Sequence, residues 1–177
     1  VSHTGALVGA DDVFEAAVRR TGAVRVTTIG QLVAAAQALS SRIHPQGNRL
    51  AIVTNGGGPG VLAADRASDL DVPLAALAPE TVARLKEALP ANWSHANPVD
   101  LIGDADAARY DAAVSACLAD PGVDGVLAIL TPQAMTAPTD VADAVAQWGT
   151  RSTKPLLAAW MGEDQVMEGR TVLRTAR

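Results

Sequence analysis

The sequence is poor in cysteine, lysine and aromatic residues, and these shortages exclude several classes of protein. Its 177 residues include one cysteine, Cys117, so neither a disulfide framework nor a cysteine-based metal site can form within it. The formal net charge is -5, the only lysines are Lys86 and Lys154, and the arginines are scattered. No basic stripe therefore exists that could neutralise a row of phosphates, and we expect no nucleic-acid partner.

Long hydrophobic runs are missing as well. The longest unbroken apolar segments, 126–130 and 156–161, have the length of strands and fall far short of the roughly 20 residues of a membrane-spanning helix. The chain does not open with the charged and then apolar segments of a secretion signal. We therefore expect a cytoplasmic protein without a membrane partner. Because the chain opens on Val1 instead of methionine, we also expect a fragment of a longer protein.

Apolar residues are nevertheless abundant, at 49% of the chain. Alanine supplies about a fifth of all residues, a composition typical of closely packed helices and sheets. From residue 49 onward, short apolar runs alternate with amphipathic stretches, which is the pattern of βαβ units around a doubly wound parallel sheet. We expect strands at 49–54, 72–77, 125–130 and 154–160, and helices at 60–69, 79–89, 107–119, 139–148 and from 164 onward.

The first 43 residues have a different organisation. They predict a helix at 10–21, a short extended run at 23–26 and a helix at 28–41, too little to bury a sheet. A turn-rich linker at 43–48 separates them from the rest. We expect residues 1–43 to be the tail of a preceding domain and residues 44–177 to form a domain of their own.

The loop after the first predicted strand is rich in glycine and leads into a helix. Such a loop allows a ligand to approach the backbone, and the free N–H groups and dipole of the helix start favour an anion. The side-chain amide of Asn55 could orient that anion. A P-loop is disfavoured because no Lys-Ser/Thr pair follows Gly60. A dinucleotide fingerprint matches at 58–63, but no acidic residue ends the second predicted strand. A purely structural turn remains the alternative.

Two further loops are candidates. Residues 131–133 follow the central predicted strand and would face Asn55 across the edge where ligands bind to such sheets. The segment 97–104 contains two carboxylates that could form an acid/base or metal pair, although helix capping by Asp104 or Asp106 explains them better. We expect no metal site.

The histidines differ in their surroundings. His44 lies in the linker and His95 in a polar loop, so we expect both to face solvent. His3 is flanked by small residues and glycines, as an accessible and mobile nucleophile requires. A mobile terminal residue without a function is its alternative interpretation.

Three motifs, in order, resemble the NDP-forming acyl-CoA synthetases, which are relatives of succinyl-CoA synthetase. They are Ser-His-Thr-Gly-Ala-Leu-Val-Gly at 2–9, Asn-Arg-Leu-Ala-Ile-Val-Thr-Asn-Gly-Gly-Gly-Pro-Gly-Val at 48–61, and Asn-Pro-Val-Asp at 97–100. The resemblance covers nearly the whole chain and implies a flavodoxin-like fold for residues 44–177. It also implies that residues 1–43 end a preceding flavodoxin-like domain.

The resemblance implies a role for each candidate residue. His3 would be a phosphohistidine that takes a phosphoryl group from an acyl phosphate and then phosphorylates ADP. Asn55 and the Gly-rich loop would bind the carboxylate or phosphate, and the loop at 131–133 would face them. The residues implied to bind substrate or phosphate are Asn55, Gly56, Gly57, Gly58, Thr131, Pro132 and Gln133.

The intact enzyme implied by the resemblance is larger than this chain. It would bind CoA, ADP or ATP, and Mg²⁺ through a CoA-binding domain and an ATP-grasp domain, in the same chain or in a partner subunit. The fragment alone is expected to be inactive and to hold no cofactor. The segment Leu-Pro-Ala-Asn-Trp-Ser at 89–94 looks most like synthetases fused to a GNAT lysine acetyltransferase. An alternative function is therefore an acyl-CoA- or carboxylate-sensing module of such an acetyltransferase.

Overall fold

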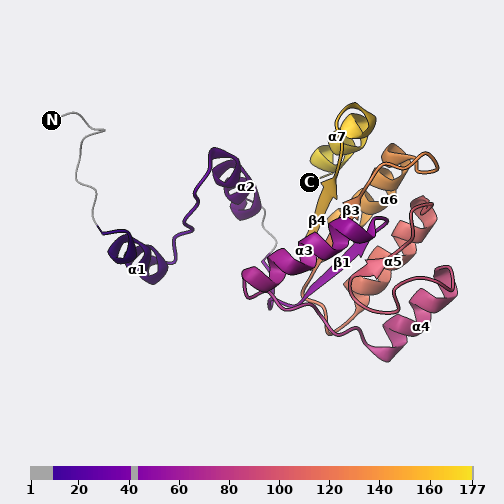
Figure 1. The fold of residues 1–177 in the computed structure, drawn as a ribbon, viewed down its shortest axis with the longest axis horizontal. Coiled ribbons are helices and arrows are strands. Elements are labelled where there is room, and N and C mark those ends of the chain that lie inside the picture. The colour runs from indigo at the N-terminus through magenta and orange to yellow at the C-terminus, as the bar shows by residue number, and fades with distance from the viewer. Residues whose placement is uncertain (1–9, 41–43, 177) are drawn as a thin grey trace. The chain divides into compact units, whose positions relative to one another are not determined.

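The computed structural model describes residues 10–40 and 44–176, and the chain divides into two compact units, residues 1–42 and 43–177 (Figure 1). The second unit contains a parallel sheet with the strand order β2-β1-β3-β4. The strands are β1 (Leu50–Thr54), β2 (Val99–Asp100), β3 (Gly125–Leu130) and β4 (Leu156–Trp160). The helices are α3 (Gly57–Asp69), α4 (Pro79–Ala88), α5 (Ala107–Ala119), α6 (Pro138–Arg151) and α7 (Met167–Thr175), with a 3₁₀ turn at Asp164–Val166.

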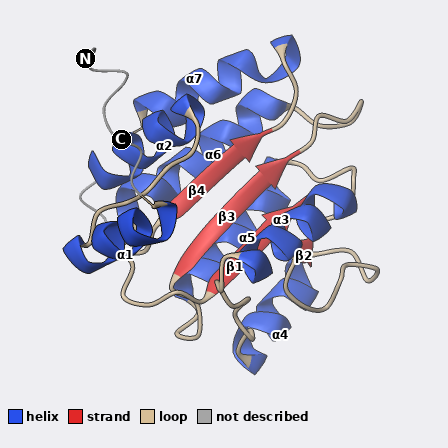
Figure 2. Ribbon diagram, turned by 60° about the vertical axis from the view of Figure 1, so that its left-hand side comes forward, coloured by secondary structure: helices blue, strands red, loops and turns tan. Residues whose placement is uncertain are grey.

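Helices cover both faces of the sheet, but unequally. Alternate side chains of a strand point to opposite faces, and in β1 the side chain of Val53 lies in the core cluster with α5, whereas Thr54 lies against Gly60 of α3. Helices α4, α5, α6 and α7 pack one against the next on the first face, and α3 packs on β1. Figure 2 shows this arrangement around the strands. The predicted doubly wound α/β fold is confirmed.

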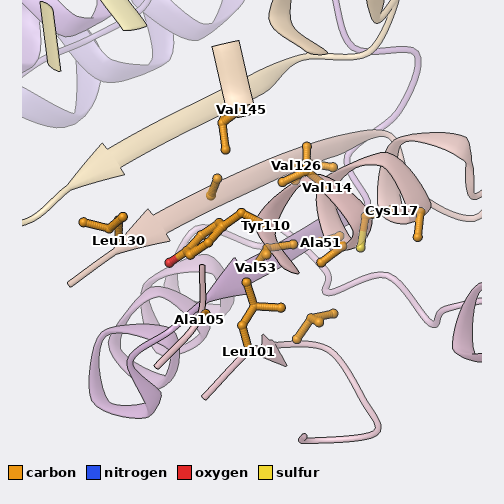
Figure 3. Packing of buried hydrophobic residues seen from close by; sticks show 14 of the residues in the cluster. Ala51, Val53, Leu101, Ala105, Tyr110, Val114, Cys117, Val126, Leu130 and Val145 are labelled. Carbon is orange, nitrogen blue, oxygen red and sulfur yellow. The ribbon is translucent and has the colours of Figure 1, made fainter. Parts of the chain in front are cut away.

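The main hydrophobic core lies between the sheet and α5. Tyr110 and Val114 of α5 are fully buried against Ala51 and Val53 of β1 (Figure 3). The Tyr110 hydroxyl donates a hydrogen bond of 2.8 Å to the carbonyl oxygen of Ile129, so this buried polar group is satisfied. Cys117 is buried in the same cluster, as predicted, and burial raises the pKa of its thiol to about 12.

Most predicted elements are confirmed, but the predicted strand at 72–77 is wrong. Only Leu74 bridges to β1, opposite Leu50. Further along β1, β2 and the side chain of Asn97 occupy the same edge. A strand covering all of 72–77 therefore cannot pair there. The two-residue strand β2 was not predicted, because two residues are too few to show a periodicity.

Three helix ends differ from their predicted positions by three residues, and other ends differ by one or two. Helix α3 begins at Gly57, three positions before the predicted start, and α6 extends to Arg151 at its C-terminus. The predicted helix from residue 164 begins as a 3₁₀ turn and continues as α7. Helix α5 has the predicted bounds.

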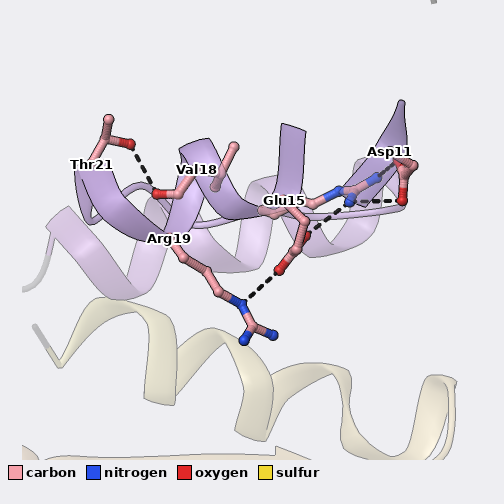
Figure 4. Close-up of polar contacts among 6 residues, drawn as sticks. Asp11, Glu15, Val18, Arg19 and Thr21 are labelled. Carbon is pink, nitrogen blue, oxygen red and sulfur yellow. Dashed lines mark hydrogen bonds and ion pairs between the residues drawn. The ribbon is translucent and has the colours of Figure 1, made fainter. Parts of the chain in front are cut away.

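The first unit contains two helices, α1 (Asp11–Thr21) and α2 (Ile29–Ser40), neither of which has a buried residue. Figure 4 shows polar contacts along α1, including the ion pair of Arg19 with Glu15. The extended run predicted at 23–26 is not part of a sheet, because the described residues of this unit offer no strand to pair with it. Its Arg25 instead forms ion pairs with Asp11 and Glu15. No helix in the described parts of the chain is long and apolar enough to cross a membrane.

Candidate functional site

The loops that follow β1 and β3 are joined by one side chain, that of Asn55. Because β1 and β3 are parallel neighbours, their carboxyl ends reach the same edge of the sheet. The Asn55 side-chain nitrogen donates to the Thr131 carbonyl oxygen at 2.8 Å. Its side-chain oxygen accepts from the Thr131 N–H and hydroxyl, both at 2.8 Å. Asn55 is only 2% exposed, so its amide holds the two loops together.

Gly56 brings the backbone of the first loop close to Thr131. A Cβ atom at Gly56 would lie 2.6 Å from the Thr131 hydroxyl oxygen, so a side chain there would push Thr131 away from Asn55. The Gly56 N–H donates to the Thr54 hydroxyl at 3.0 Å, and that hydroxyl donates to the Gly56 carbonyl oxygen. The Gly56 N–H is therefore engaged inside the loop, unlike those of the next two residues.

The start of α3 presents two exposed backbone donors. Gly57 and Gly58 are exposed, and no side chain caps the helix. Their N–H groups have no acceptor in the part of the chain that the structure describes, whereas the Gly60 N–H already bonds to Gly56. Two outward N–H groups and the positive end of the helix dipole together favour a bound anion.

The short strand β2 brings a carboxylate to the same place. A Cβ atom at Gly57 would lie 3.4 Å from Asp100 Oδ2. The other carboxylate oxygen of Asp100 accepts the Ile102 N–H at 2.9 Å, and the Asp100 N–H donates to the Ser94 hydroxyl at 3.0 Å. The site therefore combines backbone donors with one oriented carboxylate, a neighbourhood that the sequence motif alone did not predict.

The loop after β3 closes another side of this region. Gln133 is exposed, and its side chain lies about 4.0 Å from where a Cβ atom at Gly103 would be. The Gln133 N–H donates to the Thr136 hydroxyl at 2.8 Å, which shapes the turn. Pro132 packs beside Gly162 in the loop after β4. The predicted residues Thr131, Pro132 and Gln133 thus lie at one edge of the sheet with Asn55 and the glycines.

The side-chain amide of Asn97 bonds to the backbone of β1, the strand before the Gly-rich loop. Sequence reasoning missed this role. Its side-chain oxygen accepts the Ile52 N–H at 2.9 Å, and its side-chain nitrogen donates to the carbonyl oxygens of Leu50 and Ala75 at 2.8 and 3.0 Å. The amide thereby fills the gap in the ladder of β1 between the Leu74 bridge and β2. The available signal was the position of Asn97, three residues before Asp100, the strand residue that lies beside the Gly-rich loop.

The remaining candidates have structural positions. His44 and His95 are exposed, as predicted, whereas His3 lies outside the described residues. Asp106 caps α5 by accepting the Arg109 N–H at 2.9 Å, which confirms the capping interpretation. A hydrogen bond from the Arg109 guanidinium lowers the pKa of the Asp104 carboxyl. Among residues 10–40 and 44–176, no three His, Cys, Asp or Glu side chains gather as a metal site.

Two known domain families match the chain. Residues 1–39 match the succinyl-CoA ligase like flavodoxin domain, and residues 50–174 match the Ligase-CoA domain. An ADP-forming acetate–CoA ligase I of Archaeoglobus fulgidus is 38% identical over 99% of this chain and 24% of its own length. The alpha subunit of the ADP-forming acetate–CoA ligase I of Pyrococcus furiosus is 36% identical over 94% of this chain and 36% of its own length.

A solved structure is also similar. It is dinucleotide forming acetyl-coenzyme A synthetase 1 of Ca. Korarchaeum cryptofilum in complex with phosphate and ADP, with a TM-score of 0.89 and 29% identity over 97% of this chain and 38% of that one. The chain thus spans between about a quarter and two fifths of the length of these three proteins.

Proposed function

Because the chain belongs to the Ligase-CoA domain family, we propose that it is part of an ADP-forming acyl-CoA synthetase. Such an enzyme converts an acyl-CoA, ADP and phosphate into a carboxylate, ATP and CoA. The relatives named acetate–CoA ligase support a small carboxylate as the product. The observation that carries the proposal is the pair of exposed N–H groups of Gly57 and Gly58, presented at a helix start beside the joined loops of β1 and β3.

We propose three steps. Inorganic phosphate attacks the thioester carbonyl carbon and the C–S bond breaks. CoA leaves, and the product is an acyl phosphate. A ring nitrogen of His3 then attacks the phosphorus, and the bond between phosphorus and the carboxyl oxygen breaks, which releases the carboxylate. Finally, a terminal oxygen of ADP attacks the phosphohistidine, and the P–N bond breaks to give ATP and neutral His3.

The described residues would hold the phosphoryl group during these steps. The N–H groups of Gly57 and Gly58 would donate to its oxygens, and the helix dipole would stabilise its charge by about 0.3–2 kcal/mol. Asn55 would act as a positioning residue, because both ends of its amide already bind Thr131. The Asp100 carboxylate, which lies near Gly57, would accept a hydrogen bond from a donor such as an imidazole N–H. Pro132 and Gln133 would form the facing wall, where the exposed Gln133 amide could reach the substrate.

We propose that nucleotide and CoA bind outside residues 1–177. The Pyrococcus furiosus relative is named as an alpha subunit, which supports partner domains, of the CoA-binding and ATP-grasp types, in the same chain or in a second subunit. Mg²⁺ would supply charge neutralisation on the nucleotide phosphates, and we assign it no ligand among the described residues. The family match of residues 1–39 supports residues 1–43 as the end of a preceding flavodoxin-like domain.

Phosphorylation of the full-length protein tests the proposal. Incubation with Mg²⁺ and ATP labelled in its γ-phosphate is expected to give an acid-labile, base-stable phosphoprotein. The His3→Ala variant is expected to lose the label and to make no ATP from acetyl-CoA, ADP and phosphate. His44→Ala is the matched control, since His44 is exposed in the linker, and it should keep both. Label that persists in His3→Ala overturns the proposed nucleophile.

The alternative of a sensing module remains a prediction that the full-length protein can also test. If an acetyltransferase domain accompanies this chain, titration with acetyl-CoA analogues or acetate should change the rate of acetyl transfer to a lysine peptide. A rate that stays constant over the titration, in a protein that does form the phosphohistidine, removes this alternative.

A further inference from the structure

The loop after β3, residues 131–137, carries the facing wall of the site but has no buried residue of its own. Gln133 is exposed, and Met135 is 78% exposed. Within the loop, the Gln133 N–H donates to the Thr136 hydroxyl at 2.8 Å. Burial of apolar side chains is the main source of stability in a folded chain. Because this loop buries none, its position depends on contacts that other elements make with it.

Residues 160–162, which we call the β4-end segment, contact the start of this loop. The Met161 N–H donates to the Leu130 carbonyl oxygen, just before the loop, at 2.8 Å. Gly162 lies against Pro132, since a Cβ atom at Gly162 would be 3.3 Å from Pro132 Cγ. The φ angle of Gly162 is +111°, a conformation that only glycine adopts readily. The backbone of the β4-end segment therefore lies directly beside the first wall residue.

Trp160 connects the β4-end segment to the other end of the loop. Its indole N–H donates to the carbonyl oxygen of Pro138, the first residue of α6, at 2.9 Å. The Trp160 side chain is buried, and a Cβ atom at Gly169 of α7 would lie 3.2 Å from its Cδ1 atom. The indole is therefore packed tightly against α7. The β4-end segment thus holds the loop after β3 at both its start and its end.

Arg170 of α7 in turn fixes the β4-end segment. Its Nε donates to the Trp160 carbonyl oxygen at 3.0 Å, and its Nη2 donates to the same oxygen at 2.6 Å and to the Gly162 carbonyl oxygen at 2.8 Å. In the part of the chain that the structure describes, no carboxylate forms an ion pair with Arg170. The planar guanidinium presents its donors in a rigid fork, and hydrogen bonds from a charged donor are stronger than neutral ones. Arg170 therefore holds two carbonyl groups in one fixed relative position.

We propose that Arg170 is a positioning residue for the acyl half of the reaction. By fixing the β4-end segment, it keeps Pro132 and Gln133 where they face the acyl group, although Arg170 itself does not touch substrate. The proposal rests on the proposed function, because the wall acts only if an acyl substrate binds at this edge of the sheet. Transfer of the phosphoryl group between His3 and the nucleotide does not use the wall.

Hydrogen exchange of tryptophan indole protons tests the link between Arg170 and the loop. In the full-length protein labelled with ¹⁵N-tryptophan, the Trp160 signal is assigned by its loss in Trp160→Phe. We expect its indole proton to exchange at least tenfold faster in Arg170→Ala than in the wild type, because its bond to Pro138 is no longer held. The indole of Trp148, which donates to Asp111 at 2.7 Å, is the internal control and should not change.

Kinetics of the full-length protein, in the direction that consumes acetate, CoA and ATP, test the effect on the acyl half. Arg170→Ala should raise the KM for acetate at least tenfold, whereas the rate of protein labelling by γ-labelled ATP should stay within twofold of the wild type. Arg170→Lys keeps the charge but not the fork, so it should also lower kcat/KM for acetate at least fivefold. This second variant guards against a failure of the alanine variant to fold.

Arg174→Ala is the matched control, since Arg174 is an exposed arginine on the same helix, and it should keep the wild-type values throughout. An unchanged KM for acetate in both Arg170 variants overturns the positioning role. So does an equal loss of acetate use and of labelling, or equally faster exchange of both indole protons, because either indicates general damage to the fold. If the wild type forms no phosphohistidine, the proposed function fails, whereas the indole measurement still decides whether Arg170 holds the loop.

Discussion

Two asparagine side chains take the place of backbone groups in this domain. Asn55 binds the N–H and carbonyl groups of Thr131 across the carboxyl edge of the sheet. Asn97 binds those of Ile52 and Leu50 within the ladder of β1. An asparagine amide carries a donor and an acceptor in the same relative arrangement as a peptide group, which explains its use at both positions.

We predict that Asn97→Ala destabilises the protein by about 3 kcal/mol. The substitution leaves the Ile52 N–H, on a residue with 0% exposure, and the Ala75 carbonyl oxygen without partners, and each buried unsatisfied group costs about 1–3 kcal/mol. Urea denaturation measures the loss. Asn97→Asp should be at least as destabilising, because its carboxylate would face the carbonyl oxygens of Leu50 and Ala75.

The matched control is Asn92→Ala, at an exposed position five residues earlier. It should change the unfolding free energy by less than about 0.5 kcal/mol, as surface substitutions usually do. If the Asn97 and Asn92 variants were equally stable, the amide of Asn97 would not replace a ladder residue in solution.

The sequence identified Asn55 and the glycines and predicted that the loop at 131–133 faces them, but it did not predict that the Asn55 amide bonds to Thr131. A Gly-rich loop between a strand and a helix can be read locally, since neighbouring residues define it. The partner of Asn55 lies 76 positions away, and Asn97 binds a strand 45 positions before it. Such pairings depend on how the strands are ordered, which periodicity does not reveal.

At the scale of elements, a side-chain pair joins the starts of β1 and β3. Arg49 donates to Asp124 through Nε at 2.7 Å, through Nη2 at 2.9 Å and through its backbone N–H at 3.0 Å. The hydrogen bonds from Arg49 lower the pKa of the Asp124 carboxyl from 3.8 to about 2. The stability that this ion pair contributes is therefore lost as the pH falls.

We predict that part of the stability of the protein is lost between about pH 4 and pH 2. The folded state depresses the pKa of Asp124, so this stabilisation is present above the unfolded value of 3.8 and is lost as the pH falls through about 2. Asp124→Asn should be less stable than the wild type at pH 7. Its stability should also fall less between pH 4 and pH 2, measured by urea denaturation at each pH.

Asp65→Asn is the control for this pH dependence, since Asp65 is exposed on α3. Its acid transition should follow that of the wild type. An Asp124→Asn variant that loses stability with acid as steeply as the wild type would contradict the assignment to the pair with Arg49.

The predicted elements were correct where length and periodicity gave a signal. Helix α5 and strand β3 have the predicted bounds, because a long amphipathic stretch and a continuous apolar run each fit one structure. The segments 72–77 and 23–26 are rich in valine, leucine or alanine, but neither has a full-length partner strand among the described residues. Strand propensity does not form a strand without hydrogen-bonding partners.

At the scale of the whole molecule, the two units differ in how they bury apolar surface. All the residues of the core cluster lie between Ala51 and Leu173, within the second unit. In the first unit, α1 and α2 carry exposed apolar side chains such as Phe14 and Ile29. The sequence predicted a division near residue 43 from the few elements before it and the turn-rich linker after it. That residues 1–43 belong to a preceding domain stays a prediction.

We predict that removing residues 1–43 leaves the stability of the remaining 44–177 nearly unchanged. No member of the core cluster is removed, so the thermal midpoint should differ from that of residues 1–177 by less than about 2 °C, which corresponds to less than about 1 kcal/mol for a protein of this size. Circular dichroism of both proteins, followed during heating, measures the change.

Deletion of residues 164–177 is the contrasting control. It removes Val166, which is fully buried, and the helix α7 that packs on α6, so it should lower the midpoint by more than about 5 °C. A large loss of stability on removal of residues 1–43 alone would mean that the second unit depends on the first for its fold.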